Sequence, residues 1–293
     1  MSRSRLCGLL GDDIATSFSA ELHEQEGRAQ GLTYVYRLLD TTLLRGGVGA
    51  VLDVARAAGF DGLNVTQPYK RAVLRWVDEV TPDIAELGAS NTLVVDHGRV
   101  TAHNTDRGGF ARALQEGLPS AELGHVVLVG AGGAGAAVGA ALLDSGAARL
   151  TVVDLDDDAA ADVVRRLARR DGGPVDAATP ANLPGLLGSA TGVVNASPVG
   201  SVGSPGSPVP ASLLHPGLWV ADIVYRPVDT QLLTEARAAG CPVLDGTGMV
   251  ALQAAETFEL VTGVTPDAAR MRRHARQLAL RQAHPHRHTA LAS

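Results

Sequence analysis

The sequence predicts an α/β protein with two domains, and three observations support this class. Short apolar runs typical of β-strands alternate with helical segments along most of the chain. One of these strands leads directly into a glycine-rich turn and then into a helix of small residues. The length of 293 residues is sufficient for two domains of ordinary size.

The first hundred residues alternate strands and helices in a pattern typical of an α/β domain. We expect strands at 6–11, 34–39 and 62–65, helices at 20–30 and 48–58, and a hairpin of 91–95 with 99–102. A helix at 105–117 then leads into the second half of the chain. There we expect strands at 126–129, 150–153, 193–195, 218–223 and 242–244, and helices at 136–143, 249–261 and 267–282.

The glycine-rich turn reads Gly130-Ala131-Gly132-Gly133-Ala134-Gly135 and matches the G-x-G-x-x-G spacing. Gly130 permits a tight turn, Gly132 lets the backbone approach a pyrophosphate, and Gly135 permits close packing of helix on strand. The N-terminus of the helix adds N–H groups for the phosphates. The alternative is an ordinary glycine-rich turn, but the flanking strand and helix and the strand-end Asp154 together favour a dinucleotide site.

Asp154 ends the next strand, where a carboxylate can accept hydrogen bonds from the adenosine ribose hydroxyls. Leu155 follows, then three further aspartates, and no Arg or Lys occurs before Arg165. A 2′-phosphate would therefore meet several negative charges and no local cation. The sequence predicts NAD rather than NADP as the cofactor.

The composition excludes several other classes of function. A formal net charge of −6 argues against general nucleic-acid binding, and no apolar run reaches the length of a membrane span. Cys7 and Cys241 have no metal-ligand spacing and fit buried thiols in a reducing compartment. We expect a cytoplasmic protein with no metal and no nucleic-acid or membrane partner.

Polar residues follow the predicted strands of the first domain. Ser17 and Ser19 can both face a carboxylate, although Ser19 can equally cap the next helix. Lys70 follows the third strand, where a lysine is usually a solvated charge. Asn91 and Asp106 lie at element ends, where such residues usually form caps or turns. Taken singly, none of these residues indicates a function.

Considered together, the motifs resemble the shikimate dehydrogenase family, and within it the quinate/shikimate dehydrogenases that prefer NAD. They occur in the family's order over residues 6–260. The matching segments are Ser17-Phe18-Ser19, Asn64 to Lys70, Gly88 to Thr92, Asn104-Thr105-Asp106, Gly130 to Gly135, Asn195 to Gly200, Asp222 to Pro227 and Gly248 to Gln253. The resemblance implies a discontinuous substrate-binding domain, residues 1–105 with 241–293, and a Rossmann NAD-binding domain, residues 106–240.

The resemblance also implies roles for individual residues. Lys70 and Asp106 correspond to the catalytic pair at the reacting C3 hydroxyl. Substrate contacts are implied at Ser17, Ser19, Asn64, Thr66, Asn91, Tyr225 and Gln253. Beside the glycine-rich turn and Asp154, cofactor contacts are expected at Leu155, Asn195, Ser197, Val199, Ile223, Gly246 and Met249.

The chain departs from the family's pattern near Ser17. Thr16 stands where histidine is common, Ala20 where proline is common, and Asp12-Asp13 where an Asn-Pro turn is commoner. These changes can alter substrate choice. The Asn-Arg-Thr sequence usual for NADP is also absent at Asp154, in agreement with the charge argument.

The implied activity is NAD-dependent oxidation and reduction at C3 of shikimate or quinate by hydride transfer, with the Lys–Asp pair handling the hydroxyl proton. Lys70 can act as a neutral base or as a cation that holds the developing alkoxide, and the sequence leaves both open. The main alternative is a non-catalytic NAD-binding regulatory or interaction protein on the same fold. A methylenetetrahydrofolate-type dehydrogenase is weaker, because the Ser17/Ser19 pair suits a small carboxylate.

Two further expectations concern the whole chain. The partner is a small cyclitol carboxylate, and the assembly is a monomer or a homodimer. The C-terminal tail, with His284, His286 and His288, either binds a metal or is a frayed terminus, and the terminus is favoured.

Overall fold

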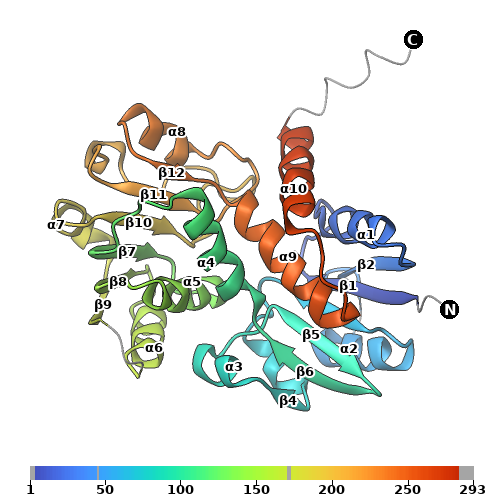
Figure 1. The fold of residues 1–293 in the computed structure, drawn as a ribbon. Coiled ribbons are helices and arrows are strands. Elements are labelled where there is room, and N and C mark those ends of the chain that lie inside the picture. Colours follow the sequence, from blue (N-terminus) through green and yellow to red (C-terminus); the bar gives the residue numbers. More distant parts are fainter. Residues whose placement is uncertain (1–3, 45, 170–172, 284–293) are drawn as a thin grey trace, which may run out of the picture. The chain divides into compact units, whose positions relative to one another are not determined.

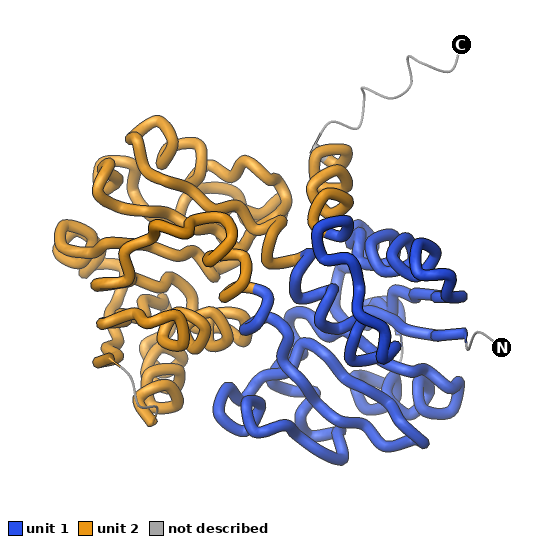
Figure 2. Tube along the Cα trace, viewed as in Figure 1, with its two compact units in different colours: residues 1–109, 251–271 blue, residues 110–250, 272–293 orange. Residues whose placement is uncertain are grey.

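The computed structural model describes residues 4–44, 46–169 and 173–283, and the histidine-containing tail lies outside these ranges. Two compact units are drawn in separate colours in Figure 2. Unit 1 comprises Met1–Gly109 and Ala251–Met271, and unit 2 comprises Phe110–Val250 and Arg272–Ser293. The boundaries differ from the predicted ones near 105 and 241. The strand at 243–244 belongs to unit 2 because it pairs with the strand at 219–222.

Unit 1 contains a mixed six-stranded sheet with the order β2-β1-β3-β5-β6-β4 (Figure 1). Its strands are β1 (Arg5–Gly11), β2 (Tyr34–Asp40), β3 (Gly62–Val65), β4 (Glu79–Val80), β5 (Thr92–Asp96) and β6 (Arg99–His103). β1 is parallel to β2 and β3, whereas β3, β5 and β6 are antiparallel neighbours. The ends of β1 and β3 therefore meet at one edge of the sheet, where polar residues follow both strands.

The helices of unit 1 cover both faces of this sheet. They are α1 (Ser19–Ala29), α2 (Gly47–Ala57), α3 (Pro82–Leu87), the 3₁₀ helix η1 (Ala72–Trp76) and most of α9 (Thr247–Thr262). The buried apolar residues of α2 pack with Leu10 and Leu63 in one core cluster. Phe258 of α9 packs with Cys7 and Leu9 in another. The two clusters use alternate residues of β1, as the two-residue period of a strand requires.

Unit 2 contains a six-stranded sheet in which all neighbouring strands are parallel, with the order β12-β11-β10-β7-β8-β9. The strands are β7 (His125–Val129), β8 (Arg149–Val153), β9 (Val175–Ala178), β10 (Gly192–Asn195), β11 (Trp219–Asp222) and β12 (Val243–Leu244). The order reverses between β7 and β10, so this is the doubly wound arrangement in which ligands bind beyond the carboxyl ends of the strands.

Helices enclose the parallel sheet of unit 2. They are α5 (Gly133–Asp144), α6 (Asp157–Leu167), α7 (Leu183–Leu187), α8 (Gln231–Ala238) and the 3₁₀ helices η2 (Pro180–Asn182) and η3 (Ala211–Leu213). Val127 and Val129 of β7 pack with residues of α7 and α8, whereas Leu128 lies on the side of Gly139 in α5. Three helices, α4 (Thr105–Gly117), α9 and α10 (Ala268–Ala283), contribute residues to both units. The predicted α/β class is confirmed.

Candidate active site

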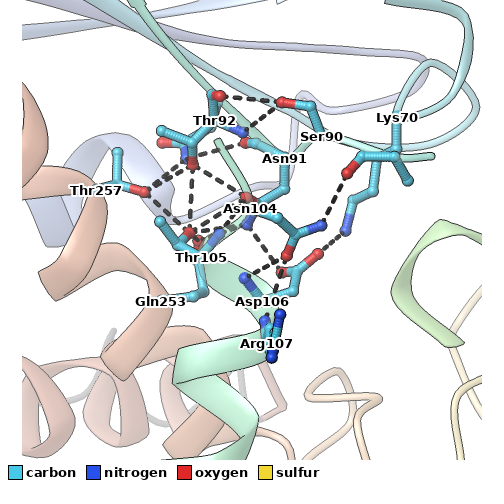
Figure 3. A network of polar contacts seen from close by, with 12 residues as sticks. Lys70, Ser90, Asn91, Thr92, Asn104, Thr105, Asp106, Arg107, Gln253 and Thr257 are labelled. Carbon is cyan, nitrogen blue, oxygen red and sulfur yellow. Dashed lines mark hydrogen bonds and ion pairs between the residues drawn. The ribbon is translucent and has the colours of Figure 1, made fainter. Parts of the chain in front are cut away.

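Lys70 and Asp106 form an ion pair in unit 1, drawn in Figure 3. Nζ of Lys70 donates to Oδ2 of Asp106 at 2.6 Å, and the side chains are only 18% and 7% exposed. Lys70 lies in the turn between β3 and η1 and not in a helix. Asp106 lies in the first turn of α4, where the helix favours a negative charge. The amino group of Lys70 is thus held in place and mostly buried rather than solvated.

Two asparagines fix Asp106, one through its carboxylate and one through its backbone. Nδ2 of Asn91 donates to Oδ1 of Asp106 at 2.9 Å, so both carboxylate oxygens have partners. Oδ1 of Asn104 accepts the backbone N–H of Asp106 at 3.0 Å. The backbone N–H of Ser90 donates to the carbonyl of Lys70 at 2.8 Å and holds the turn that carries the lysine. The position of the pair is therefore set by the segments around Asn91 and Asn104.

Gln253 and Asn64 belong to the same network of unit 1. Oε1 of Gln253 accepts from Asn91 and from Thr105, both at 3.3 Å. Asn64 is buried and donates from Nδ2 to Thr257 at 3.1 Å. The structure therefore brings together five of the predicted site residues, and it adds threonines that were not predicted as site residues. Thr257 carried a usable signal, because it lies one helical turn after Gln253 on α9.

Ser17, Ser19 and Thr66 follow the ends of β1 and β3. Oγ of Ser17 donates to Oγ of Ser19 at 3.0 Å, and both residues are partly exposed. The residue that caps α1 is Phe18, and no side chain makes a cap hydrogen bond there, so the structure does not show the capping role considered for Ser19. The backbone N–H of Thr66 donates to the carbonyl of Leu10 at 2.9 Å and keeps the two strand ends together.

Asp12, one of the departures from the family's pattern, ties three loops together. Its carboxylate accepts the hydroxyl of Tyr69 at 2.9 Å and also the hydroxyl of Thr41. Its backbone N–H donates to the carbonyl of Gln67 at 3.3 Å. The substitution therefore supplies an acceptor that fixes the loop before Ser17 against the turn before Lys70.

In unit 2 the glycine-rich turn has the geometry that a dinucleotide site needs. Gly130 has φ of +109°, and a Cβ there would lie 2.6 Å from the backbone nitrogen of Ser197. A Cβ on Gly135 would overlap the carbonyl oxygen of Gly130. A Cβ on Gly132 would meet nothing within 4 Å, so the backbone at this position faces open space at the start of α5. The turn is tight on the protein side and open where a pyrophosphate would approach.

Asp154 is held directly against this turn. Its Oδ2 accepts the backbone N–H of Ala131 at 2.6 Å, and its Oδ1 accepts the N–H of Asp156 at 3.0 Å. Leu155 beside it is 90% exposed. Asp156 caps α6 through Asp158 and Ala159. The carboxylate is fixed at the end of β8, in the position at which it would hold ribose hydroxyls.

Asn195 at the end of β10 organises the neighbouring loop. Its Nδ2 donates to the carbonyl of Val199 at 2.8 Å and to Oδ1 of Asp222 at 2.9 Å. Its Oδ1 accepts both the N–H and the hydroxyl of Ser197, at 3.0 and 2.6 Å. Asn195 is fully buried, so its side chain shapes the loop that carries Ser197 and Val199.

The remaining predicted residues lie along the ends of β11 and β12. The N–H of Ile223 donates to the carbonyl of Asn195 at 3.0 Å, and a Cβ on Gly246 would lie 2.5 Å from the carbonyl oxygen of Ile223. Met249 is buried in the first turn of α9. The guanidinium of Arg226 lies 5.8 Å from the ring centroid of Tyr225, and burial raises the pKa of the Tyr225 hydroxyl.

The described residues contain neither a metal-binding cluster nor a membrane-spanning helix. Within residues 4–44, 46–169 and 173–283, no group of three or more His, Cys, Asp or Glu side chains is arranged to hold a metal ion. No helix in this described part of the chain is both long and apolar enough to cross a membrane.

Comparison with known proteins gives several related dehydrogenases. Residues 9–93 match the family model described as the shikimate dehydrogenase substrate binding domain. A shikimate dehydrogenase (NADP(+)) from Streptomyces avermitilis is 51% identical, over 92% of this chain and 94% of that protein. A quinate/shikimate dehydrogenase (NAD(+)) from Corynebacterium efficiens is 47% identical, over 92% of this chain and 96% of that protein. The solved quinate dehydrogenase from Corynebacterium glutamicum in complex with NAD has a TM-score of 0.86 at 44% identity, over 92% and 98% of the two chains.

The names of these relatives divide between NADP and NAD, so the choice of cofactor must be argued from this chain's own residues. The assignment of the chain to a family does not depend on which cofactor it uses. Identities of 45% and above extend over more than nine-tenths of the chain, and the fold agrees with the solved relative. The chain therefore belongs to the shikimate dehydrogenase family of oxidoreductases, as its motifs indicated.

Proposed function

We propose that the protein is an NAD-dependent quinate/shikimate dehydrogenase that transfers a hydride between C3 of the cyclitol carboxylate and the nicotinamide. The observation that carries the proposal is the mostly buried Lys70–Asp106 pair at 2.6 Å. Asn91 fixes this pair and also contacts Gln253, so a proton-handling group and hydrogen-bonding amides lie together. A non-catalytic NAD-binding protein has no need of this arrangement, and it is disfavoured for that reason.

The proposed chemistry divides between cofactor and protein. NAD, when bound, supplies the hydride acceptor for alcohol oxidation. Lys70 handles the proton of the C3 hydroxyl, either by taking it or by holding the alkoxide as a cation. Asp106 fixes Nζ of Lys70, and Asn91 fixes Asp106. Pre-set hydrogen bonds of this kind contribute to rate because they need no rearrangement during the reaction.

The other predicted residues are proposed to bind the substrate. The adjacent hydroxyls of Ser17 and Ser19 suit a carboxylate, which accepts hydrogen bonds from both. Further contacts to the hydroxyls or the carboxylate of the substrate are proposed at Asn64, Thr66, Asn91, Tyr225 and Gln253. The two buried, free cysteines fit the proposed cytoplasmic location. A monomer or a homodimer stays a prediction.

NAD is proposed because of the charges around Asp154. The fixed carboxylate offers acceptors to ribose hydroxyls but would repel a 2′-phosphate. The next cations along the chain, Arg165 and Arg166, both form ion pairs with Asp162 on their own helix. These arginines are therefore already engaged with a carboxylate of α6, and the local charge favours NAD.

Initial rates with shikimate and with quinate, each with NAD and with NADP, test the proposal. We expect turnover with NAD and much lower efficiency with NADP. Asp154→Asn should weaken NAD binding about tenfold or more, since a charge-assisted hydrogen bond is lost. Asp157→Asn removes the same charge from the exposed first turn of α6 and serves as the matched control. Equal efficiency with both cofactors would refute the NAD argument, and no turnover with either acid would refute the proposed activity.

A further inference from the structure

We propose that Thr257 is a positioning residue of this site, and that its hydroxyl orients the amides of Asn64 and Gln253 for the substrate. The inference rests on the proposed function, because both amides are proposed substrate contacts. Thr257 and Gln253 are one turn apart on α9, so their side chains leave the same face of the helix. Figure 3 shows both side chains directed into the polar network that also contains Asp106 and Lys70.

Three threonine hydroxyls meet at the centre of that network. Oγ1 of Thr257 lies 2.9 Å from Oγ1 of Thr92 and 3.2 Å from Oγ1 of Thr105, and the last two are 3.2 Å apart. They come from α9, from the start of β5 and from the start of α4. All three residues are at most 3% exposed. Buried hydroxyls need partners within the protein, so this triangle of hydroxyls has a restricted set of hydrogen-bond arrangements.

The triangle fixes one end of the Asn64 amide. Nδ2 of Asn64 donates to Thr257 at 3.1 Å and to Thr92 at 3.2 Å. At the other end, Oδ1 accepts the hydroxyl of Tyr36 at 2.9 Å. The amide is therefore held by donors on one side and acceptors on the other, and it cannot rotate without losing both.

The hydrogen bonds that lead from Asn64 to Asp106 can all be donated in the same direction along the series. Asn64 donates to Thr257, which can donate to Thr92, and Thr92 donates to Oδ1 of Asn91 at 3.1 Å. Nδ2 of Asn91 then donates to Asp106. Thr257 is the first hydroxyl in this series, and no other side chain in the series comes from α9.

The same triangle sets the orientation of Gln253. Thr105 donates to Oε1 of Gln253 at 3.3 Å, so the oxygen end of this amide faces the triangle. Because Thr105 gives its one proton to Gln253 and Thr257 gives its own to Thr92, these two hydroxyls are close neighbours at 3.2 Å with no proton between them. Removal of the Thr257 hydroxyl would take an acceptor from Asn64 and a polar neighbour from Thr105. Both amides would then lose alignment, whereas the direct bond between Lys70 and Asp106 would stay intact.

Steady-state kinetics on three variants test the inference. Thr257→Val keeps the shape of the side chain and removes the hydroxyl, and Thr257→Ser restores the hydroxyl. Thr262→Val is the matched control, because Thr262 is also buried on α9 but its hydroxyl bonds only backbone groups of the helix end, the carbonyls of Phe258 and Val264 and the N–H of Val264. Thermal unfolding of each variant reports the purely structural effect of the lost hydroxyl.

We expect Thr257→Val to raise KM for the acid substrate about tenfold, the usual cost of misaligned buried hydrogen bonds. The dissociation constant of NAD should not change, kcat should fall much less than KM rises, and Thr257→Ser should restore KM to within about threefold. Thr262→Val should lower the unfolding temperature but leave KM unchanged. An unchanged KM in Thr257→Val, with active wild-type enzyme, would overturn the inference alone. Absence of turnover in the wild type would overturn the proposed function and this inference with it.

Discussion

At the scale of single residues, the arrangement depends on Asp106. One oxygen of its carboxylate holds Lys70 and the other accepts from Asn91. Loss of either partner leaves a mostly buried charge without its counter-ion or its hydrogen bond, which costs far more than the loss of an exposed pair. The proposed catalytic unit is therefore the pair, rather than the lysine alone.

Lys70→Ala should lower turnover by about 10²–10⁴, the usual range for a positioned acid or base. NAD should still bind, because the glycine-rich turn belongs to unit 2. Asp106→Asn should also slow turnover, and the double variant should be little worse than the worse single variant, since residues that act as a unit are not additive. The measurement is a double-mutant cycle on kcat with NAD affinity from titration.

Arg75→Ala is the control for the lost positive charge, because Arg75 is an exposed cation of η1. It should leave kcat near the wild-type value. Near-normal turnover in Lys70→Ala would remove the lysine from the mechanism and revive the non-catalytic alternative. Multiplicative losses in the double variant would keep both residues in the mechanism but show that they act independently.

At the scale of elements, glycines determine the backbone path of the segment from β7 to α5. Gly130 alone has positive φ there, and the carbonyl oxygen of Gly130 occupies the space next to Gly135. Gly132 has open space around its α-carbon. The three glycines of one signature therefore serve different physical purposes, which separate substitutions can distinguish.

Gly135→Ala should lower the free energy of unfolding by about 1–3 kcal/mol, because the added methyl group forces the helix away from the strand. Gly132→Ala should change stability by less than about 0.5 kcal/mol, but it should weaken NAD binding about tenfold or more because the methyl group enters the pyrophosphate's space. Chemical denaturation and NAD titration of both variants provide the measurement. If both variants lost stability equally, the division of roles between the two glycines would be wrong.

The sequence predicted most of the central strands to within one or two residues, because buried strands have an unmistakable apolar pattern. For β3 the predicted and the observed bounds are identical, residues 62–65. Several elements were not predicted: β4, α3, α6, β9, α7 and α8. For α6 the signal was present, since Asp156 caps it and Ala160, Val163 and Leu167 recur at helical spacing. β4 has only two residues, too few for any periodicity.

At the scale of the whole molecule, the chain divides into units at points that local patterns do not mark. All three boundaries fall inside continuous helices, α4, α9 and α10, and a helical pattern carries no information on where a unit ends. The motifs did predict that Lys70, Asn91, Asp106 and Gln253 share one site, and the hydrogen bonds among them agree. Of the threonines between them, only Thr257 had a signal in the sequence, one helical turn after Gln253. The meeting of the three hydroxyls could not be predicted, because only the tertiary packing of three segments brings them together.

Each unit also contains a buried titratable group, and these two groups make the stability change with pH in opposite directions. In unit 1, His23 stacks on Tyr34 and Tyr36, its Nε2 has no hydrogen-bond partner, and burial lowers its pKa to about 4. The unfolded chain binds more protons between pH 4 and 6.5, so this contribution to stability is full above pH 6.5 and is lost as the pH falls toward 4.

In unit 2, Asp222 shows the reverse dependence. Burial raises the pKa of its carboxyl to about 6, although hydrogen bonds from Thr230, Val224 and Asn195 act against the shift. The folded state binds more protons between pH 3.8 and 6, so the favourable contribution is full below pH 3.8 and is lost as the pH rises through 6. Each group changes the free energy of unfolding by about 1.4 kcal/mol per pH unit within its range.

These two slopes nearly cancel between pH 5 and 6 if both units unfold in one transition. His23→Phe should then make the protein less stable as the pH rises over this range, Asp222→Asn should make stability rise more steeply with pH, and the double variant should resemble the wild type in slope. Urea denaturation at pH 5.0, 5.5 and 6.0 measures these slopes. Glu26, whose pKa lies below its usual value of 4.5, does not titrate in this range and so does not contribute to the slopes. If the units unfold separately, two transitions should move in opposite directions with pH, and each substitution should flatten only the transition of its own unit. Differences between the variants and the wild type that do not change with pH would show that neither group titrates as its burial predicts.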